Sequence, residues 1–265
     1  MSISEQSTSV PDVPVSPEER RRWLLDRLRQ DGRLVAATLA RELATSEDTI
    51  RRDLRELAAA GLAQRVHGGA LPASPALAPF AARRHRDADA KETLAAAAIQ
   101  LLHDGQLVLI DGGTTNLAVA RLLPSRMRLT VVTPSPLVAI AAGEHPGVEV
   151  VLLGGRFDPA CQAVVGAGAV DAVRALHAQI CFLGVCSIDA EAGISVAGYE
   201  EAELKRAMLA SAAEVIAVVT ADKLGTAAPF VLGPSEMLTR IVTERTAPPS
   251  AIAALVARGI AVVRA

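Results

Sequence analysis

Residues 107–115 read LVLIDGGTT, and much of the architecture of the chain can be worked out from this stretch. Four apolar residues, Leu107–Ile110, predict a buried strand, and a helical pattern follows over 116–123. The loop between them has two glycines, which let a ligand approach the backbone closely, and the amides at a helix N-terminus attract anions. The loop follows neither the GxGxxG pattern nor the Walker pattern. It therefore predicts an anion-binding site, with a plain connecting turn as the alternative.

The same succession of apolar strand, loop and helix recurs toward the C-terminus. The further apolar stretches are 129–132, 148–153, 180–183 and 215–219. Near-continuous apolar strands that alternate with helices are typical of a mostly parallel sheet covered on both faces. Such sheets bind ligands beyond the carboxyl ends of their strands, where this chain gathers small, hydroxyl and charged residues. We expect residues 91–265 to form an α/β domain that binds a polar, phosphate-bearing molecule.

Charge is divided unevenly along the chain. The 265 residues are 51% hydrophobic and have a net charge of −2, which taken alone argues against a nucleic-acid partner. Residues 18–86, however, contain fourteen Arg and nine acidic residues, a net charge of +5, whereas residues 87–265 have a net charge of −5. A basic N-terminal part and an acidic C-terminal part indicate two modules with different partners.

Composition sets the expected domain boundaries. Residues 1–16 form a polar tail that we expect to be disordered. Residues 71–90 are expected to be a linker, because they begin with the Pro/Ala-rich stretch LPASPALAPFAA. The arginine-rich residues 17–70 then form a small α+β domain ahead of the α/β domain at 91–265.

The arginine-rich domain has the pattern of a helix-turn-helix. One helix is predicted from Pro17 to Gly32, and a second, short helix covers 35–43. Ser46 is a favourable N-cap for a third helix that ends near Gly61. Two helices, a tight turn and a capped basic helix are typical of a motif whose last helix enters the major groove of DNA.

The third helix places apolar and basic residues on opposite sides. Its buried face is predicted at Ile50, Leu54 and Leu57, and Arg51 and Arg55 fall on the other side. The two Arg are four residues apart and repel each other by a few tenths of a kcal/mol. A polyanion that lies against this face would relieve the repulsion.

The alternative for this helix is an ordinary charged surface without a partner. Asp48–Arg52 and Arg52–Glu56 have the i,i+4 spacing that stabilises a helix by itself. The stretch LAQRVHGGA that follows favours DNA binding, because it predicts a short strand and a Gly-Gly turn. Such a wing would bring Arg65 and His67 to phosphates or to a minor groove.

Several motifs resemble the DeoR family of bacterial repressors. They are TIRRDL at 49–54, GL at 61–62, RVHGGA at 65–70, DGGTT at 111–115, LGG at 153–155, EAELKRAM at 201–208 and DKLG at 222–225. The resemblance implies a winged helix-turn-helix joined to a mostly parallel α/β sensor domain with the fold of ribose-5-phosphate isomerase and the coenzyme A transferases. It also implies a homodimer or homotetramer that represses carbohydrate-metabolism genes until a phosphorylated sugar or related metabolite binds.

The resemblance places two sets of functional residues on this chain. The residues expected to bind operator DNA are Ser46, Thr49, Arg51, Arg52, Arg55, Arg65 and His67. The residues expected to bind the effector are Asp111, Gly112, Gly113, Thr114, Thr115, Thr133, Ser135, Gly154, Gly155, Lys205, Asp222 and Lys223. Two departures bear on specificity: Pro134 stands where the family usually has Asn, and the acidic pair Glu47-Asp48 opens the recognition helix.

An enzyme is the main competing interpretation. A sugar-phosphate isomerase with a DNA-binding head could use Asp111, Glu203 and Lys205 for proton transfer. The DNA-binding half would then be unexplained, so we expect no catalytic activity and no cofactor; a sensor of a non-sugar effector is a further alternative. Three cysteines without CxxC spacing argue against zinc and disulfides and for the cytoplasm. No stretch of the sequence is suited to crossing a membrane.

Overall fold

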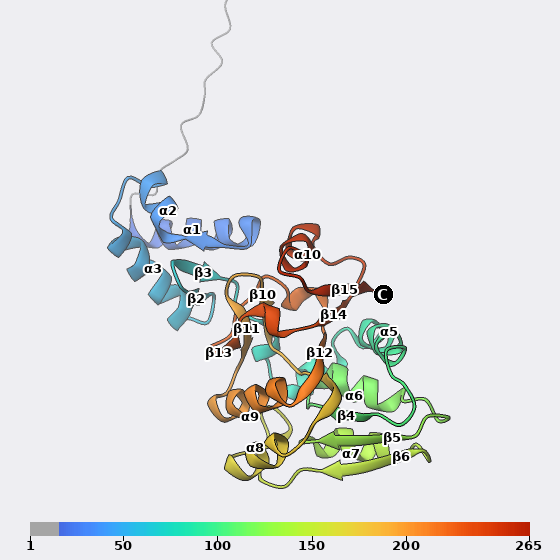
Figure 1. The fold of residues 1–265 in the computed structure, drawn as a ribbon. Helices are drawn as coiled ribbons and strands as arrows, with labels where there is room; N and C mark the ends of the chain where they lie inside the picture. Colours follow the sequence, from blue (N-terminus) through green and yellow to red (C-terminus); the bar gives the residue numbers. More distant parts are fainter. Residues whose placement is uncertain (1–15) are drawn as a thin grey trace, which may run out of the picture. The chain divides into compact units, whose positions relative to one another are not determined.

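The structure is a computed structural model that describes residues 16–265 (Figure 1). It separates into two compact units, one that ends at Pro72 and one that spans Ala73–Ala265. Apart from Ser16, the tail expected over residues 1–16 lies outside the described residues. Within residues 16–265, no helix has the length and apolar character needed to span a membrane.

The first unit is a winged helix-turn-helix, as predicted. Its helices are α1 (Pro17–Asp31), α2 (Ala36–Glu42) and α3 (Glu47–Ala59). Its antiparallel sheet has the order β1 (Leu34–Val35), β3 (Gly69–Leu71) and β2 (Gln64–Val66). Ser16 begins α1 in a reciprocal capping box with Glu19, and Gly32 ends it in the left-handed conformation. Gly69 has to be glycine, because a Cβ there would lie 1.7 Å from the Leu34 carbonyl oxygen.

The core of this unit lies between α1 and α3. Leu24 and Leu28 from α1 are buried in one cluster with Ile50, Leu54 and Leu57 from α3. The buried face predicted for α3 is therefore confirmed. Because one side of α3 is fully used for packing, its opposite side is free to present charged residues to solvent.

A forked ion pair connects the same two helices. The Arg20 guanidinium on α1 donates from Nε to Asp53 Oδ2 at 2.5 Å and from Nη2 to Asp53 Oδ1 at 3.2 Å. The Asp53 side chain is 3% exposed and the Arg20 side chain 15% exposed. The hydrogen bond to Asp53 raises the pKa of Arg20 above its already high usual value. This pair fixes the orientation of α3 on α1 through two directional bonds.

A seven-stranded parallel sheet forms the centre of the second unit (Figure 1). Its order is β15 (Ala261–Arg264), β14 (Arg240–Thr243), β12 (Ala212–Val218), β9 (Ala178–Phe182), β4 (Leu107–Ile110), β5 (Leu129–Thr133) and β6 (Val148–Leu152). All six strand pairs are parallel. The five apolar stretches that the sequence singles out correspond to β4, β5, β6, β9 and β12, and β14 and β15 are additional.

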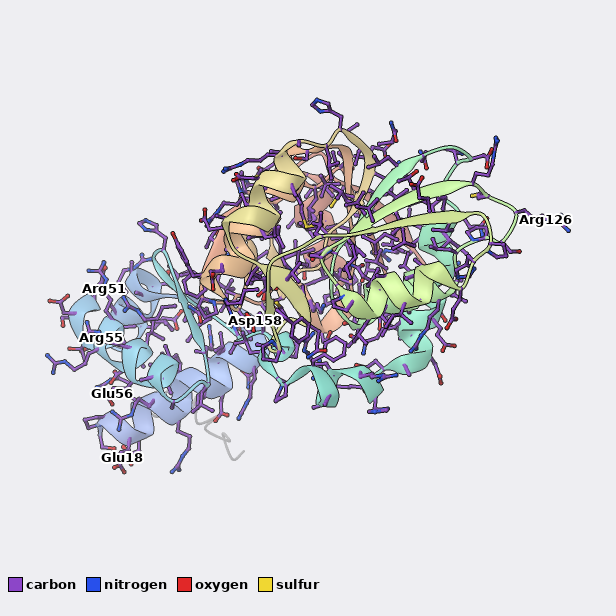
Figure 2. All side chains as sticks on the ribbon, turned by 90° about the horizontal axis from the view of Figure 1, so that it is seen from below. Glu18, Arg51, Arg55, Glu56, Arg126 and Asp158 are labelled. Carbon is purple, nitrogen blue, oxygen red and sulfur yellow. The ribbon has the colours of Figure 1, made fainter. Side chains whose placement is uncertain are left out.

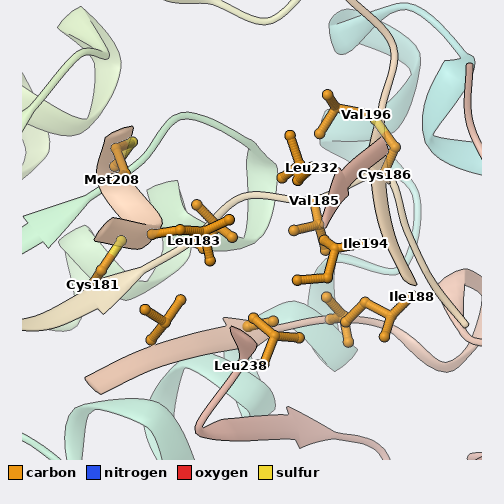
Figure 3. Packing of buried hydrophobic residues seen from close by; sticks show 14 of the residues in the cluster. Cys181, Leu183, Val185, Cys186, Ile188, Ile194, Val196, Met208, Leu232 and Leu238 are labelled. Carbon is orange, nitrogen blue, oxygen red and sulfur yellow. The ribbon is translucent and has the colours of Figure 1, made fainter. Parts of the chain in front are cut away.

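Helices cover both faces of the sheet. They are α5 (Ala88–Ile99), α6 (Thr114–Arg121) and α7 (Pro136–Gly143) on one face, and α8 (Ala167–Arg174), α9 (Tyr199–Ala210) and α10 (Pro249–Val256) on the other. Alternate residues of β4 point to opposite faces of the sheet. Val108 and Ile110 pack in the hydrophobic cluster with α5, α6 and α7, and Leu109 packs in the cluster with α8, α9 and α10. Side chains of the second cluster, including Cys181 and Leu183, are shown in Figure 3.

Smaller elements fill the connections between parallel strands. They are the hairpin β7 (Arg156–Asp158) and β8 (Ala163–Val165), the antiparallel sheet of β10 (Ser187–Asp189), β11 (Gly193–Val196) and β13 (Phe230–Gly233), and the short helices η2 (Ala221–Lys223) and η3 (Ser235–Met237). Their positions after β6, β9 and β12 place them beyond the carboxyl ends of those strands.

The segment expected as a linker is structured where it follows Pro72. It contains η1 (Pro75–Leu77) and α4 (Phe80–His85), and α5 already begins at Ala88. Ser74 is buried, caps η1 by accepting from the Ala76 amide at 3.1 Å, and donates to the Cys186 carbonyl at 2.6 Å. An uncharged Pro/Ala-rich composition is compatible with a linker and also with packing, and here Ser74 supplies the polar contacts that packing requires.

The Arg20–Asp53 pair can be tested through stability. We expect Asp53→Ala to lower the free energy of unfolding of the first unit by about 3 kcal/mol, because the Arg20 charge is left in a largely buried place without a counter-ion. Trp23, the one tryptophan of the chain, lies in α1, so its fluorescence in urea reports on this unit.

Glu56→Ala is the matched control, since Glu56 pairs with Arg21 between the same two helices at an exposed position. The loss from this variant is expected to be about 1 kcal/mol or less. Equal losses from the two variants would contradict the role given to Asp53.

Candidate functional site

The solvent side of α3 presents three arginines. Arg51, Arg52 and Arg55 are exposed, and Figure 2 shows Arg51 and Arg55 projecting outward from the helix. Ser46 caps the helix by accepting from the Thr49 amide at 3.1 Å, and its hydroxyl lies 2.9 Å from the Thr49 hydroxyl. Among the predicted DNA-binding residues, Ser46 and Thr49 therefore lie at the N-terminal end of α3, and Arg51, Arg52 and Arg55 lie on its solvent-exposed side.

The ion pairs on α3 differ from those that the spacing suggests. Arg51 pairs with Glu47 at 2.6 Å and lies 3.9 Å from Asp48. Glu56 pairs instead with Arg21 on α1. The expected pairs Asp48–Arg52 and Arg52–Glu56 are not formed, since Glu56 pairs with Arg21 and Asp48 is almost fully exposed.

Within the described residues, Arg52 and Arg55 have no acidic partner. Their guanidinium groups are free to bind phosphates or base edges. The wing adds further positive or hydrogen-bonding groups, because Arg65 and His67 are both exposed next to the β2–β3 turn. Gly68 makes this turn with a φ of 77°, a conformation that favours glycine.

A cavity of about 380 Å³ lies in the second unit at the carboxyl ends of β4 and β9. The loop after β4 contributes Asp111, Gly112, Gly113 and the beginning of α6, and the loop after β9 contributes Gly184. α9 contributes Glu201 and Lys205. This is the edge of the sheet at which the strand pattern predicts a ligand site.

A buried ion cluster forms the floor of the cavity. The Lys205 ammonium lies 3.0 Å from Asp111 Oδ2 and 2.8 Å from Glu201 Oε1, and donates to the Gly184 carbonyl at 2.5 Å. Asp111 accepts from the amides of Gly112 at 2.7 Å and Gly184 at 2.9 Å. A side chain at Gly184 would collide with this arrangement, since a Cβ there would lie 2.4 Å from the Gly112 carbonyl oxygen.

The protonation of this cluster follows from its contacts. Burial alone would lower the pKa of Lys205, but the carboxylates of Asp111 and Glu201 outweigh it and raise that pKa above its usual value. Burial would raise the pKa of Glu201, and Lys205 reverses the direction and lowers it. Burial raises the pKa of Asp111, and Lys205 limits the rise. Lys205 is therefore a fixed cation at neutral pH.

The N-terminus of α6 supplies uncompensated donors. Thr115 is 4% exposed and lines the cavity, and its hydroxyl has no hydrogen-bond partner among the described residues. The first turn of α6 contains no acidic residue, and its amides have no partner within the helix. Gly113 precedes the helix with a φ of 120°, so the backbone there stays open to a ligand. An anion at this point would satisfy the amides and the hydroxyl together.

Two further cations line the cavity. Lys223 donates from Nζ to the Val185 carbonyl at 2.9 Å, and burial lowers the pKa of Lys223 to about 8. Arg83 of α4 is the second cation. The thiol of Cys161 also lines the cavity, and burial raises its pKa to about 12, so it is an unreactive neutral group at physiological pH.

Seven of the twelve predicted effector residues line this cavity. They are Asp111, Gly112, Gly113, Thr114, Thr115, Lys205 and Lys223. The cavity lining does not include Thr133, Ser135, Gly154, Gly155 and Asp222.

The five residues outside the cavity have other surroundings. Thr133 and Ser135 are buried, and the Thr133 hydroxyl accepts from the Ser135 amide at 3.1 Å, which shapes the turn after β5. Gly154 and Gly155 follow β6 at an exposed position. Asp222 accepts from Arg86 Nη2 at 2.9 Å and from the Thr220 hydroxyl at 2.6 Å.

The cavity also contains residues that the sequence reasoning did not select. The charged and polar ones are Arg83, Asn116, Asp158 and Glu201. Glu201 stands four residues before Lys205 on one helix, a spacing that could have identified it as a partner. Arg83 lies in the segment expected as a linker, so its place in the cavity had no local signal.

Similar domains are known for both halves of the chain. Residues 20–75 match the DeoR-like helix-turn-helix domain, and residues 86–245 match the DeoR C terminal sensor domain. The chain belongs to the DeoR family. This confirms the resemblance seen in the sequence motifs. The first unit of this DeoR-family chain corresponds to the helix-turn-helix domain of the family, and the second unit, which contains the cavity, corresponds to the sensor domain.

Proteins similar to this DeoR-family chain span most of its length. The HTH-type transcriptional regulator GlpR of Haloferax volcanii is 36% identical over 212 residues, covering 79% of this chain and 82% of that protein. The glycerol-3-phosphate regulon repressor of Escherichia coli K12 is 29% identical over 238 residues, with 89% and 94% covered. The HTH-type transcriptional repressor GlcR of Bacillus subtilis is 30% identical over 230 residues, with 86% and 88% covered.

Solved structures show more distant likenesses. Ribose 5-phosphate isomerase A from Methanocaldococcus jannaschii covers 52% of this chain and 54% of its own length at 18% identity, with a TM-score of 0.38. The full-length sorbitol operon regulator SorC from Klebsiella pneumoniae covers 91% and 100% at 13% identity, with a TM-score of 0.43.

The ion cluster can be tested by removing its cation. We expect Lys205→Met to lower the free energy of unfolding of the second unit by about 3–5 kcal/mol at pH 8, because two buried carboxylates lose their counter-ion. Their pKa values then exceed those of the unfolded chain, so the folded state binds more protons and the deficit should shrink as the pH falls from 8 to 5. Urea unfolding followed by far-UV circular dichroism measures both effects.

Arg206→Met is the matched control, because Arg206 is a neighbouring cation of α9 that pairs with Glu203 at a partly exposed position. Arg206 also donates to the carbonyls of Val231 and Leu232, so some loss of stability is expected, but it should be independent of pH over this range because no buried carboxylate loses its counter-ion. A pH-independent loss in Lys205→Met would contradict the electrostatic account of the cluster.

Proposed function

We propose that the chain is a transcriptional repressor that binds operator DNA through α3 and the wing and is released by a phosphorylated sugar or related metabolite. The effector would bind in the cavity, with its phosphate at the N-terminus of α6. The observation that carries this proposal is the Thr115 hydroxyl, which is buried without a partner among the described residues next to free helix amides. The same cavity contains Lys223 and Arg83, and within the described residues neither of them forms an ion pair. Family membership and the names of the relatives, which include a glycerol-3-phosphate regulon repressor, support it.

The DNA-binding half of the proposal is supported by unpaired arginines on one exposed side of α3. Arg52 and Arg55 supply charge without a local counter-ion, and Arg51 would have to exchange Glu47 for DNA. The acidic residues at the start of α3 thus compete with DNA for Arg51 and leave Arg52 and Arg55 available to bind it. A helix-turn-helix reads paired half-sites through dimer symmetry, so a homodimer or homotetramer that acts in the cytoplasm belongs to the same proposal.

An isomerase is the less favoured function. Of the three residues nominated for proton transfer, Asp111 and Lys205 are locked in an ion pair, and Glu203 pairs with Arg206 instead of lining the cavity. The raised pKa of Lys205 keeps its proton in place at neutral pH, which is unsuited to acid–base exchange. Turnover of pentose or hexose phosphates by the purified protein would overturn this conclusion.

The arginines of α3 give a prediction for DNA binding. We expect Arg52→Ala and Arg55→Ala each to weaken binding to the promoter region beside the gene by about tenfold, since each removes a contact to phosphate or base. The dependence of the affinity on salt should fall by about one phosphate contact for a residue that contacts the backbone. Fluorescence anisotropy with a labelled DNA fragment measures both quantities.

Arg126→Ala serves as the control for net charge, because Arg126 is exposed in the second unit (Figure 2). Its affinity for the same fragment should match that of the unaltered protein. Similar losses from all three variants would mean that charge in general, and not the face of α3, determines binding.

The pKa of Lys223 predicts a pH dependence of effector binding. Burial lowers this pKa to about 8, so Lys223 loses its proton between pH 7 and 9, a range in which a sugar phosphate stays doubly charged. The affinity for the effector should therefore fall by up to about tenfold from pH 7 to pH 9. Calorimetry with the compound that gives the largest shift in a thermal screen of phosphorylated metabolites measures the change.

Lys223→Arg should remove this pH dependence, because a guanidinium keeps its charge over the whole range. Lys205 does not contribute, since its pKa is raised away from this range. An unchanged affinity at pH 9 in the unaltered protein would show that Lys223 does not contact the phosphate.

A further inference from the structure

One wall of the cavity is formed by the segment that directly follows the DNA-binding unit. The first unit ends at Pro72, and the cavity lining includes residues 76–80 and Arg83. Only three residues separate Pro72 from the first of these lining residues. Any molecule that fills the cavity therefore contacts the stretch of chain that leads to the helix-turn-helix.

The part of this wall formed by α4 is weakly held. None of the residues of α4 (Phe80–His85) is buried, so the helix contributes no side chain to either core cluster of the second unit. Its attachment at the C-terminal side is polar: Lys91 donates from Nζ to the Arg83 carbonyl at 2.6 Å, and Arg86 pairs with Asp222 at 2.9 Å. A helix without buried apolar contacts is readily displaced or fixed by a ligand.

Before α4 the same segment is firmly anchored. Ser74 is buried and donates to the Cys186 carbonyl at 2.6 Å, and its amide donates to the Ala227 carbonyl at 3.0 Å. Ala76 is 4% exposed. The chain after Pro72 thus has a fixed point at 73–76 and a loosely attached helix immediately beyond it, facing the cavity.

Arg83 is the charged group that α4 presents to the cavity. Its Nε donates to the Ala78 carbonyl at 2.9 Å, and its guanidinium lies 5.5 Å from the centre of the Phe80 ring. Within residues 16–265 it forms no ion pair, and its charge helps to lower the pKa of Glu201, another residue of the cavity lining. Burial lowers the pKa of Lys223, and the positive charge of Arg83 lowers it further, so the two cations repel each other across the cavity.

An anion placed between these two cations would remove their repulsion. It would also accept hydrogen bonds from Arg83, which is forked and suited to phosphate. We propose that Arg83 is a phosphate ligand of the effector, and that its contact with the bound phosphate docks α4 on the cavity and so transmits effector binding to the DNA-binding unit. This inference rests on the proposed effector cavity and adds both a ligand and a route of coupling to it.

Phosphate binding by the full-length protein tests the ligand role. Inorganic phosphate is titrated into the unaltered protein, Arg83→Met and Arg84→Met, with sodium chloride at matched ionic strength as the reference, and thermal shifts are recorded. Arg84 is exposed on the same helix and does not line the cavity, so it is the matched control. We expect about tenfold weaker binding in Arg83→Met, as for the loss of one charge-assisted hydrogen bond, and unchanged binding in Arg84→Met.

The outcomes separate the two proposals. If the unaltered protein does not respond to phosphate, the proposed effector cavity is wrong and this inference fails with it. If the unaltered protein responds and Arg83→Met binds equally well, only the ligand role of Arg83 is overturned.

Hydrogen exchange and DNA release test the coupling. Phosphate should slow amide exchange over residues 80–90 and weaken operator binding in the unaltered protein and in Arg84→Met. In Arg83→Met, both effects should be absent at phosphate concentrations that saturate its weaker site. Release of DNA by saturated Arg83→Met to the same extent as by the unaltered protein would overturn the route through α4.

Discussion

The buried contact between Lys205 and two carboxylates holds the ligand-binding end of the second unit together. Asp111 follows β4, whereas Glu201 and Lys205 belong to α9, so one ammonium group joins segments about ninety residues apart in the sequence. The cavity lining contains three acidic residues, Asp111, Asp158 and Glu201, and three basic ones, Arg83, Lys205 and Lys223, so its charges balance in number. An anionic ligand therefore enters a site whose own charges are already paired or supported, which limits the cost of its desolvation.

The strand and loop that carry this site could be predicted from the sequence, but the order of the neighbouring strands in the sheet could not. Strand period and glycine preference are local properties, so β4 and the glycines of the loop were predicted correctly, whereas α6 begins at Thr114 and ends at Arg121, two residues earlier at each end than predicted. Thr133, Ser135 and residues 154–155 follow β5 and β6, which end at the same edge but on one side of β4. The neighbour of β4 on the other side is β9, and a single sequence does not reveal that order.

Charge in the first unit shows the same division between local and tertiary information. The helical spacing correctly separated the buried and exposed faces of α3. It also suggested that Glu56 neutralises Arg52, but the tertiary structure assigns Glu56 to Arg21 on another helix. The net charge of +5 over residues 18–86 is therefore less informative than the question of which arginines remain without a partner.

The three lysines of the chain all lie in the second unit, and each donates to a main-chain carbonyl. Lys91 and Lys205 are buried, and Lys223 is half-buried in the cavity wall. The positive surface charge is consequently almost entirely that of arginine, so the protein offers few side-chain amines to acylating reagents or enzymes. An amine-directed label would react slowly at these positions, and its rate at Lys223 would become a chemical measure of how often the cavity is open and empty.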